Sequence, residues 1–109
     1  MNKNSNIGFI GLGNMGKPIF DNLNKNFSNI FCFDKDTSKL KKNNSSSLIE
    51  IFEKCKIIIF CIESNEQIID IIKKNTIKKN TVIVDLTSSL PDLTQKISSY
   101  LKIFESHYI

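Results

Sequence analysis

Hydrophobic and polar positions alternate along the chain between two patterns. Short apolar runs, rich in Ile, Val and Phe, are separated by segments in which apolar residues recur every three or four positions. The first pattern is typical of buried strands, and the second is typical of helices packed on one face. Because the two patterns alternate, we expect an α/β fold with a doubly wound parallel sheet in three layers, forming one domain over residues 1–109.

Four strands are predicted, and a fifth is expected to begin near the C-terminus. They cover residues 7–10, 29–33, 56–62, 81–85 and 103–104. We expect the partial strand order 3-2-1-4-5, numbered along the sequence, which places the third strand beside the second.

Helices are predicted between these strands. The first follows Gly16, has Pro18 in its first turn, and carries one apolar stripe. A short, weak helix and a loop are expected over 35–47. Capping-box spacings predict helices that begin after Ser47 and after Ser64, and another helix is expected from Ser89. The stripe of the first helix consists of Met15, Ile19, Phe20, Leu23 and Phe27.

The first strand runs into the motif Gly11-x-Gly13-x-x-Gly16, which opens the first helix. In this setting Gly11 permits a tight turn, Gly13 permits close approach of a pyrophosphate, and Gly16 permits close helix–strand packing. The amides of Asn14 and Met15 are the expected phosphate donors. A turn without any ligand is the alternative, but four glycines gathered within residues 8–16 favour a Rossmann-type dinucleotide site.

Asp34 ends the second strand 18 positions after Gly16, close to the spacing of about 20 expected for a ribose-binding carboxylate. Such a carboxylate favours NAD over NADP, because it repels a 2′-phosphate, although Lys35 partly offsets the repulsion. A solvated carboxylate at a strand end is the alternative. Sites for FAD or S-adenosylmethionine are less favoured, since FAD sites usually carry Glu at this point.

Composition is ordinary for a soluble globular protein, with 40% hydrophobic and 24% charged residues. No apolar run reaches the roughly 18 residues needed to span a bilayer, and the polar N-terminus does not resemble a secretory signal. We therefore expect a cytoplasmic protein without membrane contacts. The net charge of +4 comes from scattered lysines without any arginine, so no nucleic-acid partner is expected. Cys32, Cys55 and Cys61 are interpreted as buried free thiols without a metal.

The stretch IGFIGLGNMGKPIFDNL closely resembles the β-hydroxyacid dehydrogenases. That family includes 3-hydroxyisobutyrate dehydrogenase, tartronate semialdehyde reductase and relatives of 6-phosphogluconate dehydrogenase. The resemblance extends from about Ile7 to Phe104. It implies an N-terminal Rossmann domain that binds NAD or NADP, in an oxidoreductase that transfers hydride between nicotinamide and a small 3-hydroxyacid.

Two later blocks depart from the family pattern. Where the family has Met-Leu-Pro, this chain has Cys61-Ile62-Glu63, and an exposed surface position is the favoured alternative for Glu63. The family block Asp-x-Ser-Thr-x-x-Pro is similar to residues 85–91, in which Ser88 replaces the Thr near the nicotinamide. This block also fits a helix cap. The residues expected to contact the cofactor are Gly11, Leu12, Gly13, Asn14, Met15, Gly16, Asp34, Ile62, Glu63 and Ser88.

No position matches the family's catalytic lysine, which lies in a helical C-terminal domain, and His107 is not assigned a catalytic role. The resemblance therefore implies a truncated dehydrogenase that binds cofactor without turnover and that needs the missing domain to bind a small hydroxyacid. The alternative is a stand-alone NAD(H)-binding module that regulates or binds a partner. We also expect marginal stability, or self-association through uncovered apolar surface.

Overall fold

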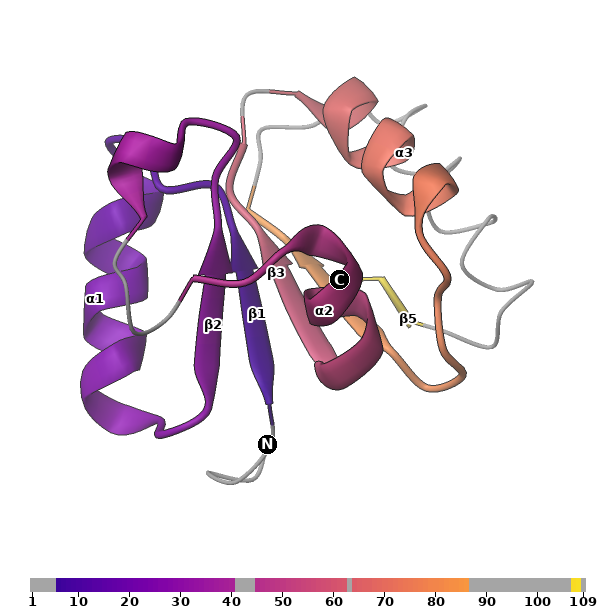
Figure 1. Ribbon diagram of the computed structural model, residues 1–109, viewed down its shortest axis with the longest axis horizontal. Coiled ribbons are helices and arrows are strands. Elements are labelled where there is room, and N and C mark those ends of the chain that lie inside the picture. The colour runs from indigo at the N-terminus through magenta and orange to yellow at the C-terminus, as the bar shows by residue number, and fades with distance from the viewer. Residues whose placement is uncertain (1–5, 41–44, 63, 87–106, 109) are drawn as a thin grey trace.

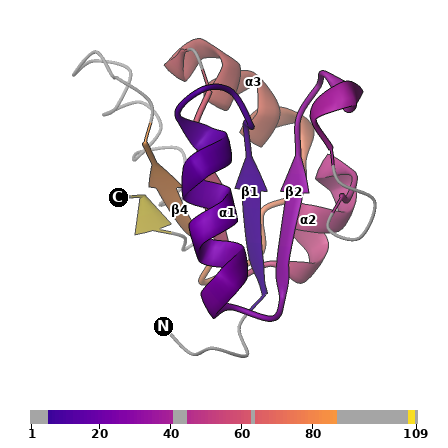
Figure 2. The ribbon, with the colours of Figure 1, turned by 90° about the vertical axis from the view of Figure 1, so that its left-hand side faces the viewer.

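The computed structural model describes residues 6–40, 45–62, 64–86 and 107–108. Its strands form one parallel sheet: β1 (Ile7–Ile10), β2 (Ile30–Phe33), β3 (Ile57–Phe60), β4 (Val82–Asp85) and β5 (His107–Tyr108). The helices are α1 (Gly16–Asn26), the 3-10 turn η1 (Thr37–Lys39), α2 (Leu48–Lys54) and α3 (Asn65–Lys74). Helix α1 covers one face of the sheet, and α2 and α3 cover the other (Figures 1 and 2). The predicted three-layer, Rossmann-like α/β fold is confirmed.

The predicted strand order is wrong at the third strand. The observed order is β2-β1-β3-β4-β5, so β3 pairs with β1 and not with β2. The outer side of β2 instead carries an isolated parallel bridge between Cys32 and Ser45, where the Ser46 N–H donates to the Cys32 carbonyl at 3.0 Å. Ser45 thus pairs with β2 from within the polar segment 35–47, which was predicted to form a helix and a loop. The strand that follows, β3, lies on the other side of β1.

The apolar residues of β3 are covered on both faces of the sheet. The strand reads Ile-Ile-Ile-Phe, and Ile58, Ile59 and Phe60 are all buried. Ile58 and Phe60 belong to the cluster under α2 and α3, whereas Ile59 belongs to the cluster under α1. Cover on both faces is typical of strands in parallel sheets.

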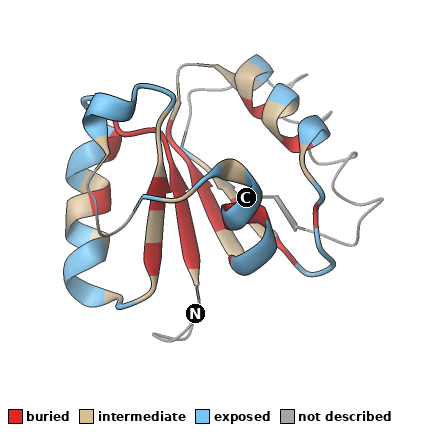
Figure 3. Ribbon diagram, viewed as in Figure 1, coloured by how far each residue is buried: buried red, intermediate tan, exposed pale blue. Residues whose placement is uncertain are grey.

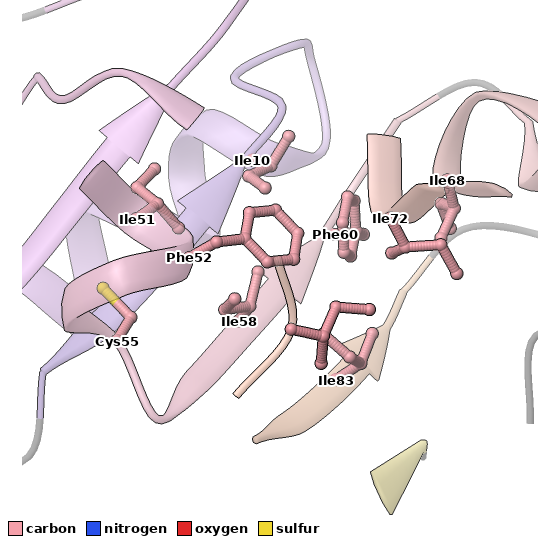
Figure 4. Packing of buried hydrophobic residues seen from close by; sticks show 10 residues of the cluster. Ile10, Ile51, Phe52, Cys55, Ile58, Phe60, Ile68, Ile72 and Ile83 are labelled. Carbon is pink, nitrogen blue, oxygen red and sulfur yellow. The ribbon is translucent and has the colours of Figure 1, made fainter. Parts of the chain in front are cut away.

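Two apolar clusters, one on each side of the sheet, hold the layers together (Figure 3). Against α1, Phe20 meets Phe9 edge-to-face with ring centroids 5.9 Å apart. On the other face, Phe52 of α2 and Ile68 and Ile72 of α3 pack on Ile10, Ile58, Phe60 and Ile83 (Figure 4). Gly8 of β1 permits the close approach of α2, since an added Cβ there would lie 2.4 Å from Cγ2 of Ile51.

Helix α1 buries its predicted stripe except at one position. Phe20 is 1% exposed, and Ile19, Leu23 and Phe27 pack partly buried against the same cluster. Met15 was expected in this stripe and is 57% exposed. It precedes the first helical turn as the N-cap residue, at the carboxyl edge of the sheet, so its side chain lies outside the covered face.

Side-chain caps fix the starts of α2 and α3, as their spacings predict. At α2, Ser47 accepts from the Glu50 amide at 3.2 Å and the Glu50 carboxylate accepts from the Ser47 amide at 3.2 Å. At α3, Ser64 accepts from the Gln67 amide at 3.4 Å. Each bond satisfies one of the amides that the first helical turn leaves without a partner.

Replacing Ser47 with Ala should lower the free energy of unfolding by about 1 kcal/mol, because the Glu50 amide loses its acceptor. Urea unfolding followed by circular dichroism measures the change. Ser28→Ala, at an exposed turn between α1 and β2, is the matched control and should leave the unfolding midpoint unchanged. Equal midpoints for the two variants would show that the cap does not stabilise α2.

The three cysteines are buried free thiols, as predicted. Burial raises the pKa of Cys55 to about 11, and burial together with the Asp85 charge raises the pKa of Cys61. Both thiols are therefore protonated at neutral pH. Within the described ranges, no helix is both long and apolar enough to cross a bilayer.

Two predictions concern residues that the structure does not describe, namely the helix from Ser89 and a strand over 103–104. The short β5 pairs in parallel with β4 through Val82–His107 and Ile83–Tyr108. A fifth strand is therefore present at residues 107–108, whereas the start expected at 103–104 lies outside the described residues.

Candidate functional site

The turn that follows β1 begins at Gly11, in a backbone conformation that only glycine adopts readily. Gly11 has φ +107°, and its N–H donates to the Phe33 carbonyl at 2.9 Å. An added Cβ would lie 2.1 Å from the carbonyl oxygen of Cys61 and 2.8 Å from Cγ2 of Ile62. Both the backbone angle and the close approach of the chain after β3 require glycine here.

Gly16 and Gly13 differ sharply in what surrounds them. At Gly16 an added Cβ would lie 2.2 Å from the Gly11 carbonyl oxygen, so Gly16 lets α1 begin directly against the turn. At Gly13 an added Cβ would meet no atom of the described residues within 4 Å. The protein's own packing therefore explains Gly11 and Gly16, whereas it leaves open space beside Gly13.

The start of α1 has no side-chain cap. Its N-cap residue is Met15, whose side chain makes no capping hydrogen bond, and the Lys17 amide of the first turn donates to the Gly13 carbonyl at 3.0 Å. By contrast, η1, α2 and α3 begin with caps from Asp36, Ser47 and Ser64. The first-turn amides of α1, with the positive end of the helix dipole, face the carboxyl edge of the sheet beside the open space at Gly13.

Asp34 lies directly against the glycine turn. Its Oδ2 accepts from the Leu12 amide at 2.7 Å, and its Oδ1 accepts from the Asp36 amide at 2.8 Å. An ionised carboxylate has about four acceptor positions, so both oxygens keep further capacity. The glycine motif and the end of β2 are thus joined by two hydrogen bonds, from the Gly11 amide to the Phe33 carbonyl and from the Leu12 amide to the Asp34 carboxylate.

The end of β3 completes this edge of the sheet. The Cys61 amide donates to the Ile10 carbonyl at 2.8 Å, and Ile62 lies against Gly11. The connection that leaves β1 leads to β2 on one side of the sheet. The connection that leaves β3 leads to β4 on the other side, so the two connections diverge here. Ligands of open α/β sheets bind at such a switch point. Glu63 and Ser88 lie outside the described residues.

The structure therefore brings together eight of the ten predicted site residues, which are Gly11, Leu12, Gly13, Asn14, Met15, Gly16, Asp34 and Ile62. Asp36 was missed. Its carboxylate accepts from the Ser38 amide at 3.1 Å and from the Ser38 hydroxyl at 2.6 Å, and this caps η1. An Asp two residues before a Ser, just after a strand, is a turn signal that could have been found.

A family model for the NAD-binding domain of 6-phosphogluconate dehydrogenase matches residues 6–109. The chain belongs to this family. Among curated relatives, mitochondrial 3-hydroxyisobutyrate dehydrogenase of Mus musculus is 29% identical over 84% of this chain and 31% of its own length. The 2-(hydroxymethyl)glutarate dehydrogenase of Eubacterium barkeri is 31% identical over 90% of this chain and 36% of its own length. The chain thus spans about a third of these relatives.

Solved structures share the fold at low sequence identity. A 3-hydroxyisobutyrate dehydrogenase from Mycobacterium tuberculosis, solved with L-serine, superposes with a TM-score of 0.85 at 16% identity, covering 96% of this chain and 39% of that one. A reductive aminase from Aspergillus terreus, solved with NADPH and ethyl levulinate, superposes with a TM-score of 0.86 at 14% identity, covering 96% of this chain and 39% of that one. The Rossmann-like architecture found here is therefore that of an NAD(P)-binding domain in larger oxidoreductases.

Proposed function

We propose that this chain is the NAD(H)-binding part of an oxidoreductase that interconverts a small 3-hydroxyacid and its carbonyl form. The observation that carries the proposal is the open space beside Gly13 at an uncapped helix start, within a domain of the 6-phosphogluconate dehydrogenase family. A bound nicotinamide would supply the hydride acceptor or donor.

The described residues fit a dinucleotide. A pyrophosphate needs N–H donors and close access to the backbone, and the amides of Asn14 and Met15 beside Gly13 offer both. An adenosine ribose needs an acceptor for its hydroxyls, and Asp34 keeps acceptor capacity on both oxygens. Ile62 and the exposed Met15 side chain supply apolar surface at the same edge.

Asp34 favours NAD(H) over NADP(H). Its carboxylate is held against the turn by the Leu12 amide, so it cannot swing away to admit a 2′-phosphate without losing that bond. The chain also contains no arginine, the residue best suited to bidentate phosphate recognition.

For the reaction itself, this chain supplies the cofactor half of the site. The names of the curated relatives support a small hydroxyacid as substrate. No position matches the family's catalytic lysine, so proton transfer and substrate binding are assigned to a further domain of the kind that makes up the rest of those relatives. The chain alone is expected to bind cofactor without turnover.

Titration of the folded chain with NADH, followed by nicotinamide fluorescence, tests the cofactor proposal. We expect saturable binding that ADP-ribose competes away, because ADP-ribose carries both the pyrophosphate and the adenosine ribose. Nicotinamide mononucleotide lacks the pyrophosphate and should compete poorly. A sample with a cooperative unfolding transition but no saturable NADH binding would overturn the proposal.

A further inference from the structure

We propose that Met15 is a modification site, at which a peroxide oxidises the thioether to the sulfoxide, and that this change weakens dinucleotide binding. The proposal rests on the proposed function, because its consequence is measured as a loss of NADH affinity. The feature that carries it is the exposed side chain of Met15, which the packing of α1 on the sheet does not use.

Met15 carries the accessible sulfur atom of the described residues. The chain contains two methionines and three cysteines, and Met1 lies outside the described part. The Met15 residue is 57% exposed. The cysteines are all buried, with exposed fractions of 0% for Cys32, 4% for Cys55 and 7% for Cys61. An oxidant in solution therefore reaches the thioether, whereas the core keeps it from the thiols.

The chemistry of the two kinds of sulfur group enlarges this difference. A thiol reacts with a peroxide as its thiolate, so a raised pKa slows the reaction. Burial raises the pKa of Cys55 to about 11, and burial together with the Asp85 charge raises the pKa of Cys61. A thioether has no proton to lose and needs only access to the oxidant. Peroxide should therefore modify Met15 before it modifies these thiols.

The reaction consumes one peroxide molecule and needs no other reagent. A lone pair of the Met15 sulfur attacks one peroxide oxygen, so that an S–O bond forms while the O–O bond breaks. The sulfur loses two electrons and the peroxide gains them. With hydrogen peroxide, the products are the sulfoxide and water.

The place of Met15 in the fold connects its oxidation to binding. It is the N-cap residue of α1 and follows the open space at Gly13 by two positions. A dinucleotide bound as proposed would cover this apolar side chain. The sulfoxide is polar, so covering it costs desolvation. Its oxygen is also a hydrogen-bond acceptor beside the same amides, of Asn14 and Met15, that a phosphate needs.

The test treats the folded chain with dilute hydrogen peroxide, removes the peroxide, and measures NADH affinity by fluorescence titration. Peptide mass spectrometry should find an added oxygen on the Met15 peptide before any on the cysteine peptides. We expect the oxidised chain to bind NADH about three- to tenfold more weakly. Its urea unfolding midpoint should stay unchanged, because Met15 does not belong to either apolar cluster of the described residues.

Met15→Leu is the matched control, since leucine keeps an apolar side chain and has no sulfur to oxidise. This variant retains Met1 and the three cysteines, so an effect of peroxide at those groups would appear in it as well. Its NADH affinity after peroxide treatment should equal its own affinity before treatment. In the wild type, methionine sulfoxide reductases for both epimers should restore the affinity. Dithiothreitol alone, which reduces sulfenic acids and disulfides, should not.

Conversion of Met15 to the sulfoxide without a change in NADH affinity would overturn this inference and leave the proposed function intact. Oxidation of the cysteines ahead of Met15, or an equal loss of affinity in peroxide-treated Met15→Leu, would overturn it too. Absence of saturable NADH binding by the untreated, folded chain would overturn the proposed function, and with it the effect on binding. The mass measurement would still decide in that sample whether Met15 is the preferred site of oxidation.

Discussion

Replacing Gly11 with Ala should destabilise the fold by about 3–5 kcal/mol, a large part of the stability of a small domain. Two effects add. Alanine is strained at φ +107°, and its Cβ would lie 2.1 Å from a backbone carbonyl oxygen of Cys61, which has no rotamer with which to move aside. Relief requires either the glycine turn or the chain after β3 to shift, although both are fixed by backbone bonds at Gly11 and Cys61.

Gly13→Ala is the matched control for this prediction, since it makes the same chemical change two residues away, where no atom in the described part of the chain lies within 4 Å of the added Cβ. Urea unfolding followed by circular dichroism should show a much lower midpoint for Gly11→Ala and a nearly unchanged one for Gly13→Ala. If Gly11→Ala proves too unstable to purify, its sensitivity to proteolysis in the lysate, compared with that of Gly13→Ala, gives the same ranking. Similar stability of the two variants would contradict the packing described for the turn.

Local patterns in the sequence were sufficient to predict most of the fold. The capping box at Ser47 and Glu50 formed with both of its hydrogen bonds, since its geometry depends on only four consecutive residues. The stripe of α1 was correct at Phe20 for a similar reason, because helical periodicity is set locally. The glycine motif and Asp34 met as expected, because strand–turn–helix geometry fixes where the end of the neighbouring strand lies.

The strand order could not be obtained in the same way, since it depends on contacts between distant segments. Ser45 pairs with Cys32 through backbone groups alone, and a polar, Asn- and Ser-rich segment gives no strand signal. The apolar run of β3 does not determine the order either, because β2 is also apolar at every position and lies at the edge of the sheet.

The same distinction applies to the candidate site. Gly11, Gly13 and Gly16 look alike in the sequence, and their separate roles appear only once their neighbours are known. Gly11 and Gly16 are required by contacts within the chain. Asp36 was missed because its position depends on the side chain of Asp34, a tertiary detail with only a weak turn signal in the sequence.

Replacing Gly13 with Val should leave the fold intact and weaken NADH binding by roughly 5- to 150-fold, or about 1–3 kcal/mol. Gly13 differs from Gly11 and Gly16 in having no close neighbours among the described residues. No atom of the described residues comes within 4 Å of a Cβ at Gly13, so the new side chain should cost little stability. It does occupy the space through which a pyrophosphate must approach the amides at the start of α1.

Fluorescence titration with NADH gives the affinity, and urea unfolding without ligand gives the stability of the same samples. Gly13→Ala should fall between wild type and Val in affinity, because its side chain fills less of the approach. Asn22→Ala, on an exposed position of α1 away from the turn, should bind NADH as wild type does. Loss of stability in Gly13→Val would mean that the chain itself needs this glycine. Unchanged affinity in a stable Gly13→Val would mean that the dinucleotide does not approach the helix start here, so the open space at Gly13 would need another explanation.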